Sequence, residues 1–207
     1  MKFTLPKVYP ITDISITKLS HLEQVQQLIE GGAAFIQLRD KHSTPREFYE
    51  SAKSVMDFTR GSEVKIIIND RVDIALAVKA DGVHLGQDDL PPQYARQILG
   101  EKAIIGFSTH NIPQAIEAAK FSLDYIAIGP IFSTSTKENP DPVVGLEGLK
   151  TVRESIGAFP LVAIGGINSA NAKDVLANGA DSLAIISGIL REPTKISQAF
   201  RQFVEQL

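Results

Sequence analysis

The chain repeats one pattern of hydrophobic and polar positions: a short apolar run, a loop, and then an amphipathic stretch with helical periodicity. The apolar runs predict eight strands, over Val8–Thr12, Phe35–Leu38, Val64–Asn69, Gly82–Leu85, Ile104–Phe107, Tyr125–Ile128, Leu161–Ile164 and Ser182–Ile186. The amphipathic stretches predict helices over Leu22–Ile29, Thr44–Thr59, Val72–Val78, Pro91–Leu99, Ile112–Phe121, Leu146–Ile156, Ala170–Ala177 and Ile196–Leu207. Thr44, followed three residues later by Glu47, predicts a capping box at one helix start.

Strands that alternate with helices predict a parallel sheet. Continuous apolar runs such as KIII and LVAI are typical of strands covered on both faces. Eight such units in 207 residues predict a single (β/α)₈ TIM barrel, one domain over residues 1–207, with its active site at the C-terminal ends of the strands. An open doubly wound sheet is the alternative. It usually has glycines in its first strand–helix turn, whereas here that turn reads ITDISITKL.

Composition narrows the function classes. Hydrophobic residues make up 43% of the chain, charged residues 22%, and the formal net charge is −3, so no basic excess points to nucleic acid. No apolar run is long enough for a membrane span, and the N-terminus lacks a signal-peptide core, so we expect a cytoplasmic protein. The absence of cysteine excludes disulfides, thiolate metal sites and a cysteine nucleophile.

Cationic and amide side chains follow the second predicted strand. Side chains alternate along a strand, so Gln37, Arg39 and Lys41 share one face at the expected mouth of the barrel. Arginine and lysine together suit a polyphosphate, because one supplies a planar fork and the other a compact charge. The alternative is a solvated charged loop, which would not explain the shared face.

Two carboxylates follow the third and fourth predicted strands. Asp70 and Asp89 come from adjacent strand ends, and Mg²⁺ prefers one or two carboxylates together with phosphate oxygens and water. Each aspartate could instead cap the helix that follows it. The pair, next to the cationic cluster, favours a magnesium site.

Later strand ends carry hydroxyl groups and glycines. Ser108 follows the fifth strand, where it could donate to an oxyanion or start the next helix, and His84 and His110 are given no role. A long loop from Gly129 through Lys137 is interpreted as a lid, with a flexible surface loop as the alternative. The turns IGGI and ISGI after strands seven and eight are typical of phosphate sites in this fold.

These motifs, in this order, resemble the thiamine phosphate synthase family. The segments that carry the resemblance are QLRDK, INDRVDIALAVKADGVHLGQDDL, GFSTH, IGPIFSTSTK, GLEGL and VAIGGI with ISGI, over nearly the whole chain. The resemblance implies a (β/α)₈ barrel that couples hydroxymethylpyrimidine pyrophosphate to hydroxyethylthiazole phosphate and releases pyrophosphate. It further implies a dissociative reaction in which pyrophosphate leaves first and the thiazole nitrogen captures the pyrimidine-methyl cation.

The same resemblance implies roles for particular residues. The pyrimidine pyrophosphate would be bound by the QLRDK segment with Asn69 and, nearby, Ser108; that segment is Gln37, Leu38, Arg39, Asp40 and Lys41. Thr134, Ser135 and Thr136 would approach the thiazole phosphate, whose site is completed by Gly166, Ile186 and Ser187. Asp70 and Asp89 would bind Mg²⁺, and the groups expected to promote the chemistry are Lys137, Ser108, Arg39 and Lys41. Relatives commonly have proline where this lid has Ser135, which should loosen the loop without removing charge.

Three other functions would explain part of this sequence. Thiazole tautomerases resemble this family in fold but have a catalytic histidine where this chain has Pro130, and they lack much of the pyrophosphate site. A non-catalytic barrel that senses thiamine phosphate is disfavoured by the intact pair of aspartates. Another phosphate-binding barrel of amino-acid or nucleotide synthesis would explain the glycine turns but not QLRDK. We therefore expect small-molecule substrates, no nucleic acid and no membrane, and we leave a homo-oligomer open.

Overall fold

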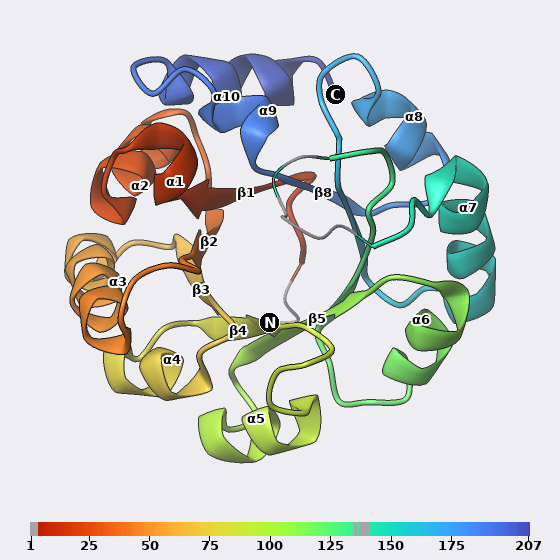
Figure 1. Ribbon diagram of the computed structural model, residues 1–207, viewed down its shortest axis with the longest axis horizontal. Helices are drawn as coiled ribbons and strands as arrows, with labels where there is room; N and C mark the ends of the chain where they lie inside the picture. Colours follow the sequence, from red (N-terminus) through yellow and green to blue (C-terminus); the bar gives the residue numbers. More distant parts are fainter. Residues whose placement is uncertain (1–3, 135, 137–140) are drawn as a thin grey trace.

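The computed structural model describes residues 4–134, 136 and 141–207, and these form a closed barrel of eight parallel strands. The strands follow one another around the barrel in sequence order, and β8 pairs with β1 to close it (Figure 1). They are β1 (Val8–Asp13), β2 (Phe35–Arg39), β3 (Lys65–Asn69), β4 (Gly82–Leu85), β5 (Ile104–Thr109), β6 (Tyr125–Ile128), β7 (Leu161–Ile164) and β8 (Ser182–Ile185). The predicted (β/α)₈ barrel is confirmed.

Helices surround the strands on all sides, as Figure 1 shows. They are α1 (Ile14–Thr17), α2 (His21–Glu30), α3 (Pro45–Thr59), α4 (Val72–Val78), α5 (Pro92–Leu99), α6 (Ile112–Ala118), α7 (Gly145–Ile156), α8 (Ala172–Ala177), α9 (Ser187–Leu190) and α10 (Ile196–Glu205). Every predicted helix has a counterpart, and the capping box at Thr44 and Glu47 is present. None of the described helices is long and apolar enough to cross a membrane.

Sequence periodicity missed two short helices and misplaced some ends. The helices α1 and α9 have four residues each, which is too short for a 3.6-residue period to show. The helix α6 ends at Ala118, three residues before the predicted end. The reason is local: the amides of Lys120 and Phe121 bond three residues back, to Glu117 and Ala118, in tight turns instead of helical geometry.

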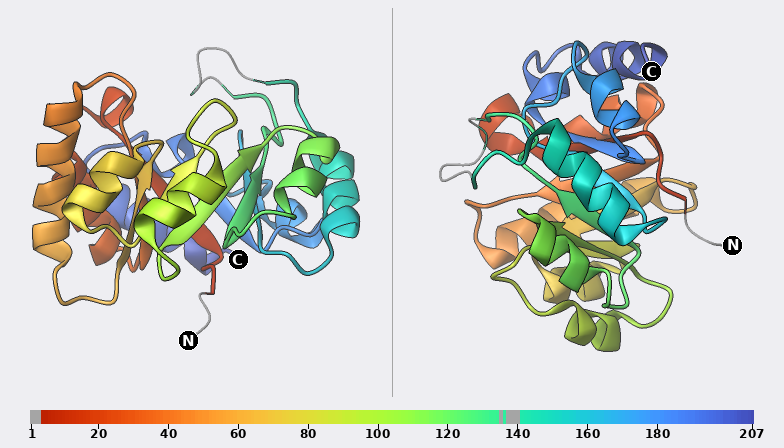
Figure 2. Two further views of the ribbon diagram at one scale, coloured as in Figure 1. Left: turned by 90° about the horizontal axis from the view of Figure 1, so that it is seen from below. Right: turned by 90° about the vertical axis from the view of Figure 1, so that its right-hand side faces the viewer.

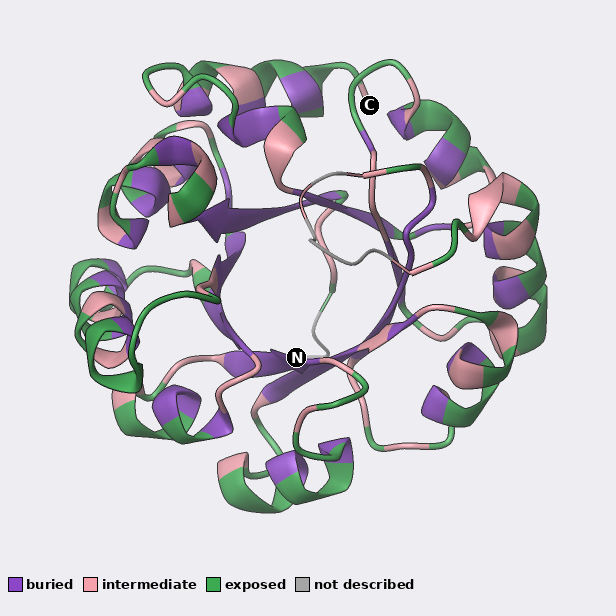
Figure 3. Cartoon of the chain, in the orientation of Figure 1, coloured by how far each residue is buried: buried purple, intermediate pink, exposed green. Residues whose placement is uncertain are grey.

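Buried side chains form two separate hydrophobic clusters, one on each side of the barrel wall. The inner cluster fills the barrel and contains Tyr9, Ile11, Phe35, Ile67, Ile104, Tyr125, Ala127, Val162 and Ala184. The outer cluster lies between strands and helices, and it takes the alternate strand positions, such as Ile36 and Leu38 of β2. Figure 3 shows the buried residues on the strands and on the helix faces turned towards them.

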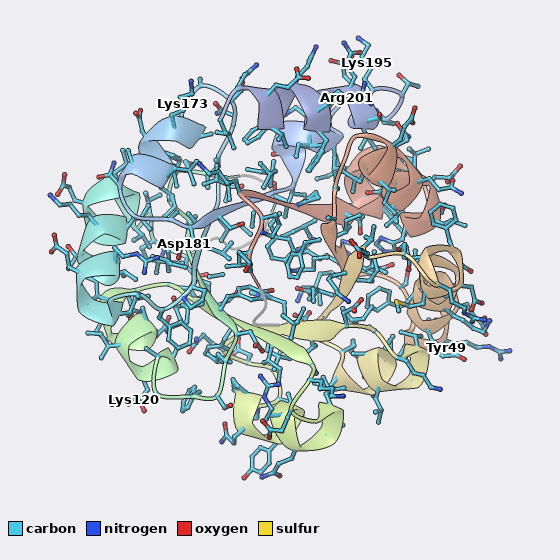
Figure 4. The ribbon with its side chains drawn as sticks, turned by 180° about the vertical axis from the view of Figure 1, so that it is seen from behind. Tyr49, Lys120, Lys173, Asp181, Lys195 and Arg201 are labelled. Atoms are coloured by element: carbon cyan, nitrogen blue, oxygen red, sulfur yellow. The ribbon has the colours of Figure 1, made fainter. Side chains whose placement is uncertain are left out.

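Three aspartates each link two neighbouring strands at the end of the barrel where the strands begin. Asp81, Asp124 and Asp181 each directly precede an even-numbered strand, and each accepts the amide of the first or second residue of the preceding odd-numbered strand. The donors are Ile66 at 2.9 Å, Ile105 at 2.8 Å and Leu161 at 2.8 Å, in that order. Figure 4 labels Asp181 inside the ring of helices, whereas Lys120 and Lys195 lie on its rim.

Two of these aspartates are also held by arginines from the helices. Arg96 of α5 donates to Asp124 at 2.7 Å and to the carbonyl of Ala103 at 2.5 Å. Arg153 of α7 donates to Asp181 at 2.5 Å and to the carbonyl of Phe159 at 2.9 Å. Each arginine therefore fastens a helix end and two strand starts, which makes this end of the barrel a rigid base for the opposite end.

We predict that Asp124→Ala lowers the free energy of unfolding by about 2–4 kcal/mol, because it leaves the Ile105 amide without an acceptor and leaves the largely buried Arg96 guanidinium with carbonyl acceptors but no carboxylate. The matched control is Asp57→Ala, which removes an exposed aspartate that pairs with Lys53 and Arg60, and should leave the free energy of unfolding nearly unchanged. Urea unfolding measures both. Equal effects would show that the aspartate contributes no more than a surface ion pair.

Candidate active site

A cavity of about 560 Å³ lies at the end of the barrel where the strands end. Twelve residues predicted from the sequence line it: Gln37, Arg39, Lys41, Asn69, Asp70, Asp89, Ser108, Thr134, Thr136, Gly166, Ile186 and Ser187. The described parts of the segment between β6 and α7 rise at the same end (Figure 2). The structure therefore brings residues from most of the strand ends to one cavity.

Four predicted residues are not among those lining residues, for two different reasons. The side chain of Leu38 is fully buried in the outer cluster, and Asp40 accepts hydrogen bonds from Ser43 and His42 outside the cavity. Alternation along β2 turns these two side chains away while Gln37, Arg39 and Lys41 point inward. Ser135 and Lys137 lie outside the described residues.

The two cations are each held by an aspartate. Arg39 donates to Asp13 at 2.6 Å, and Asp13 is buried and also accepts the amide of Ser15. Lys41 forms an ion pair with Asp70. Asp13 at the end of β1 thus fixes the Arg39 guanidinium, while the more exposed Lys41 is paired with a group predicted to bind metal. Sequence reasoning gave Asp13 no role, although it ends the first strand.

The predicted metal ligands do not cap helices. The residues at the N-caps of α4 and α5 are Arg71 and Pro91, and neither makes a side-chain cap bond. Asp89 instead accepts the amide of Gly86 at 2.7 Å. Burial raises the pKa of Asp89 above its usual value, with a further rise from the negative charge of Asp70, against the lowering effect of the Gly86 amide. Two neighbouring carboxylates repel each other when both are ionised, and a cation between them would relieve that repulsion.

Asn69 provides a hydrogen-bond donor with no partner among the described residues. Its side-chain nitrogen is buried at the end of β3, on the cavity wall. A buried donor without a partner is costly unless a ligand or water completes it. The Asn69 nitrogen could therefore donate to a ligand in the cavity, and its role in substrate binding stays a prediction.

Histidines that sequence reasoning left without a role also line the cavity. His84 is hydrogen-bonded through one ring nitrogen to Tyr125 at 2.9 Å and through the other to Ser108 at 2.8 Å. Burial lowers the pKa of His84 to about 4, so the ring is neutral at pH 7. His110 contacts the Gly129 carbonyl at 2.8 Å. Alternation along β4 was the one sign in the sequence, because it places His84 on the same face of the strand as Gly82, the face that points inward.

The glycine turn after β7 packs against the start of the β6–α7 segment. Gly165 and Gly166 have φ values of 101° and 66°, in the left-handed region that favours glycine. A Cβ on Gly166 would lie 2.6 Å from the Ser133 carbonyl oxygen, and one on Gly165 would lie 2.5 Å from Pro130. The close packing of two loops therefore requires both glycines, whereas the sequence analysis expected this turn to be glycine-rich because of a phosphate site.

The fold and the cavity define a class of protein: a (β/α)₈ barrel with cations, carboxylates and glycine turns at the end where its strands end. The chain belongs to the thiamine monophosphate synthase family, whose pattern it matches over residues 8–189. It is 49% identical to the thiamine-phosphate synthase of Clostridium novyi over 186 residues, covering 89% of this chain and 91% of that one. The enzyme of that name from Methanospirillum hungatei is 44% identical, over 96% of each chain.

A solved structure shows the same likeness in three dimensions. The thiamine phosphate pyrophosphorylase from Pyrococcus furiosus superimposes with a TM-score of 0.83 at 40% sequence identity, covering 97% of this chain and 96% of that one. The resemblance inferred from QLRDK and the later motifs is therefore confirmed at the level of the family.

We predict that Asp89→Asn raises the melting temperature of the metal-free protein by on the order of 1–3 °C. Because the folded-state pKa of Asp89 lies above its unfolded value, the ionised carboxylate costs stability at pH 7. That cost is relieved as pH falls through the raised pKa, because Asp89 becomes protonated. The difference in melting temperature between the variant and the wild type should therefore shrink in acid. Calorimetry with Asp88→Asn as control, an exposed neighbour on the same loop, measures the shift. A lower melting temperature for Asp89→Asn would contradict the prediction.

Proposed function

We propose that the protein joins a pyrimidine-methyl pyrophosphate to a thiazole phosphate, giving thiamine phosphate and pyrophosphate. The observation that carries the proposal is that a barrel of the thiamine monophosphate synthase family gathers Arg39, Lys41, Asp70, Asp89 and the unpartnered donor of Asn69 in one cavity. Transfer of this kind needs two phosphorylated substrates side by side, and one cavity with separate groups for each is suited to it.

The two substrates would divide the cavity between them. The pyrimidine pyrophosphate would lie on the side of β2 to β5, where Arg39, Lys41, Asn69 and Ser108 line the wall. The thiazole phosphate would lie near the ends of β7 and β8, at Gly166, Ile186 and Ser187, with Thr134 and Thr136 across from it. This division assigns the more highly charged substrate to the side that carries the cations.

The pair of aspartates fits Mg²⁺. Asp70 and Asp89 would hold it, since the ion needs only one or two carboxylates when phosphate oxygens and water complete its shell. No cluster of three or more acidic or histidine ligands occurs among the described residues, which also suits a site completed by substrate. When bound, the ion would neutralise the pyrophosphate. Lys41, now paired with Asp70, would then be free to turn towards the substrate.

The chemistry needs charge stabilisation and no nucleophilic side chain. The carbon–oxygen bond breaks first and its electron pair leaves with pyrophosphate. The lone pair of the thiazole nitrogen then forms the new carbon–nitrogen bond. Arg39, fixed by Asp13, and Lys41 stabilise the leaving group by preorganised charge. On sequence alone, we assign Lys137 the same task from the lid.

The residue at position 130 bears on the tautomerase alternative. Pro130 lines the cavity, at the position where the resembling isomerases have a catalytic histidine. A proline side chain cannot accept or donate a proton, so this chain lacks the base that an isomerase would need at this position.

We predict that thiamine phosphate formation from both substrates requires a divalent cation. EDTA should abolish it and Mg²⁺ should restore it, and Asp70→Ala and Asp89→Ala should each reduce kcat by at least about 10²-fold. The measurement is product formation by chromatography, with circular dichroism to show that the variants fold. Wild-type turnover in chelated, metal-free buffer would refute the metal site, and no product under any condition would favour the non-catalytic barrel.

We predict that the two halves of the cavity separate in steady-state kinetics. Ser187→Ala should raise KM for the thiazole phosphate about tenfold and leave KM for the pyrimidine substrate within about twofold, and Asn69→Ala should do the reverse. Ser187 tests the thiazole side better than Gly166, because a larger residue at Gly166 would collide with Ser133 and move the loop. The same effect of one variant on both KM values would contradict the division.

A further inference from the structure

Five side chains form a continuous hydrogen-bonded chain through the floor of the cavity. The Gln37 amide nitrogen donates to the Tyr9 hydroxyl at 2.7 Å, and the two tyrosine hydroxyls, of Tyr9 and Tyr125, are 2.8 Å apart. Tyr125 then meets Nδ1 of His84 at 2.9 Å, and Nε2 of His84 meets the Ser108 hydroxyl at 2.8 Å. The chain runs from β2 through β1, β6 and β4 to β5, so its two ends are both cavity-lining residues.

The direction of this chain follows from the hydrogen-bonding capacity of each group. An amide nitrogen can only donate, so the Tyr9 oxygen accepts from Gln37, and its own proton goes to Tyr125, its other partner among the described residues. Tyr125 consequently donates to Nδ1 of His84. A ring nitrogen that accepts a hydrogen bond carries no proton, so this imidazole is neutral. Burial raises the pKa of both tyrosines, so each hydroxyl retains its proton.

The single proton of the neutral imidazole must therefore lie on Nε2, where it is donated to the oxygen of Ser108. With that acceptor position filled, the hydroxyl proton of Ser108 is turned away from His84 and towards the cavity that Ser108 lines. The opposite polarity would leave Tyr9 with a buried proton and no acceptor among the described residues, which would cost free energy.

A glycine makes room for the central contact. His84, Gly106 and Tyr125 lie side by side on β4, β5 and β6 in the strand register. A Cβ on Gly106 would lie 2.0 Å from the Tyr125 ring, so only glycine lets that ring cross β5. The rings of Tyr125 and His84 stack at 5.5 Å with an angle of 20° between their planes. The contact between His84 and Tyr125 is thus positioned by strands and not by loops.

We propose that this chain fixes Ser108 as a hydrogen-bond donor to an acceptor atom of the substrate, with His84 and Tyr125 as positioning residues that set its direction. The inference rests on the proposed function, and deepens it by stating the polarity of one substrate contact. Catalysis gains because the hydroxyl does not have to reorient as the reaction proceeds.

The first test measures the His84 tautomer directly in the intact protein. The chain has four histidines, so ¹⁵N-histidine labelling with His84→Gln as the assignment variant identifies the signals. We expect an unprotonated Nδ1 and a protonated Nε2 at pH 7. In Tyr125→Phe this preference should be lost, whereas Tyr94→Phe, which alters a half-exposed tyrosine of α5, should leave it unchanged. A protonated Nδ1 in the wild type overturns the proposal.

The second test separates positioning from simple structural support. Tyr125→Phe should reduce kcat about tenfold, which is about 1.4 kcal/mol of transition-state stabilisation, with little change in either KM. In the Ser108→Ala background the same substitution should have almost no further effect on kcat, because its target is gone. His84→Gln, whose amide can still donate near the Nε2 position, should retain more activity than His84→Ala. Additive effects, or equal loss in both histidine variants, would refute the inference.

The first test is independent of the proposed function, whereas the second depends on it. The tautomer is read without substrate, so a protonated Nδ1 refutes the chain even if thiamine phosphate is formed. Conversely, absence of product from the wild-type protein with Mg²⁺ and both substrates refutes the proposed reaction. In that case the inference in its catalytic form falls with it, while the measured tautomer still decides the direction of the hydrogen bonds.

Discussion

Alternation of side chains along eight closed parallel strands is the constraint on which the other features depend. It divides the buried residues into an inner and an outer cluster, and it decides for each strand end which side chain reaches the cavity. In β2 this single rule separates Arg39, on the cavity wall, from its neighbours Leu38 and Asp40, which face the helices. Closure makes the rule rigid, since a slip of one residue in any strand would exchange its two faces.

The same rule explains how much of the fold and the site could be predicted. Eight strands and the inward set of Gln37, Arg39 and Lys41 follow from short-range patterns in the chain, and the structure has them. The cavity-side assignment of Leu38 and Asp40 came from the resemblance of a whole segment, where alternation alone would have left them out. The helices α1 and α9 are shorter than the repeat that reveals a helix.

Contacts across the barrel were beyond such patterns. The link from Tyr125 to His84 joins residues 41 positions apart, and it depends on the register of three strands. Gly106 is the one local sign of it, a glycine inside a strand where a side chain would be expected. His84 therefore looked like an isolated histidine in the sequence. The role of Asp13 was hidden in the same way, because its partner Arg39 lies on the next strand.

Stability and function occupy opposite ends of the barrel. Where the strands begin, Asp124 and Asp181 each accept hydrogen bonds from a strand amide and from an arginine of a helix. Where the strands end, Asp89 carries charge against a raised pKa and the Asn69 nitrogen has no partner among the described residues. Such unsatisfied groups persist only when the surrounding structure holds them in place. A polar floor fixed through Tyr9 and Tyr125 meets that need, because it orients the groups above it without adding charge. The well-bonded end of the barrel thus keeps the unsatisfied groups at the opposite end in position, where substrate and metal would complete them.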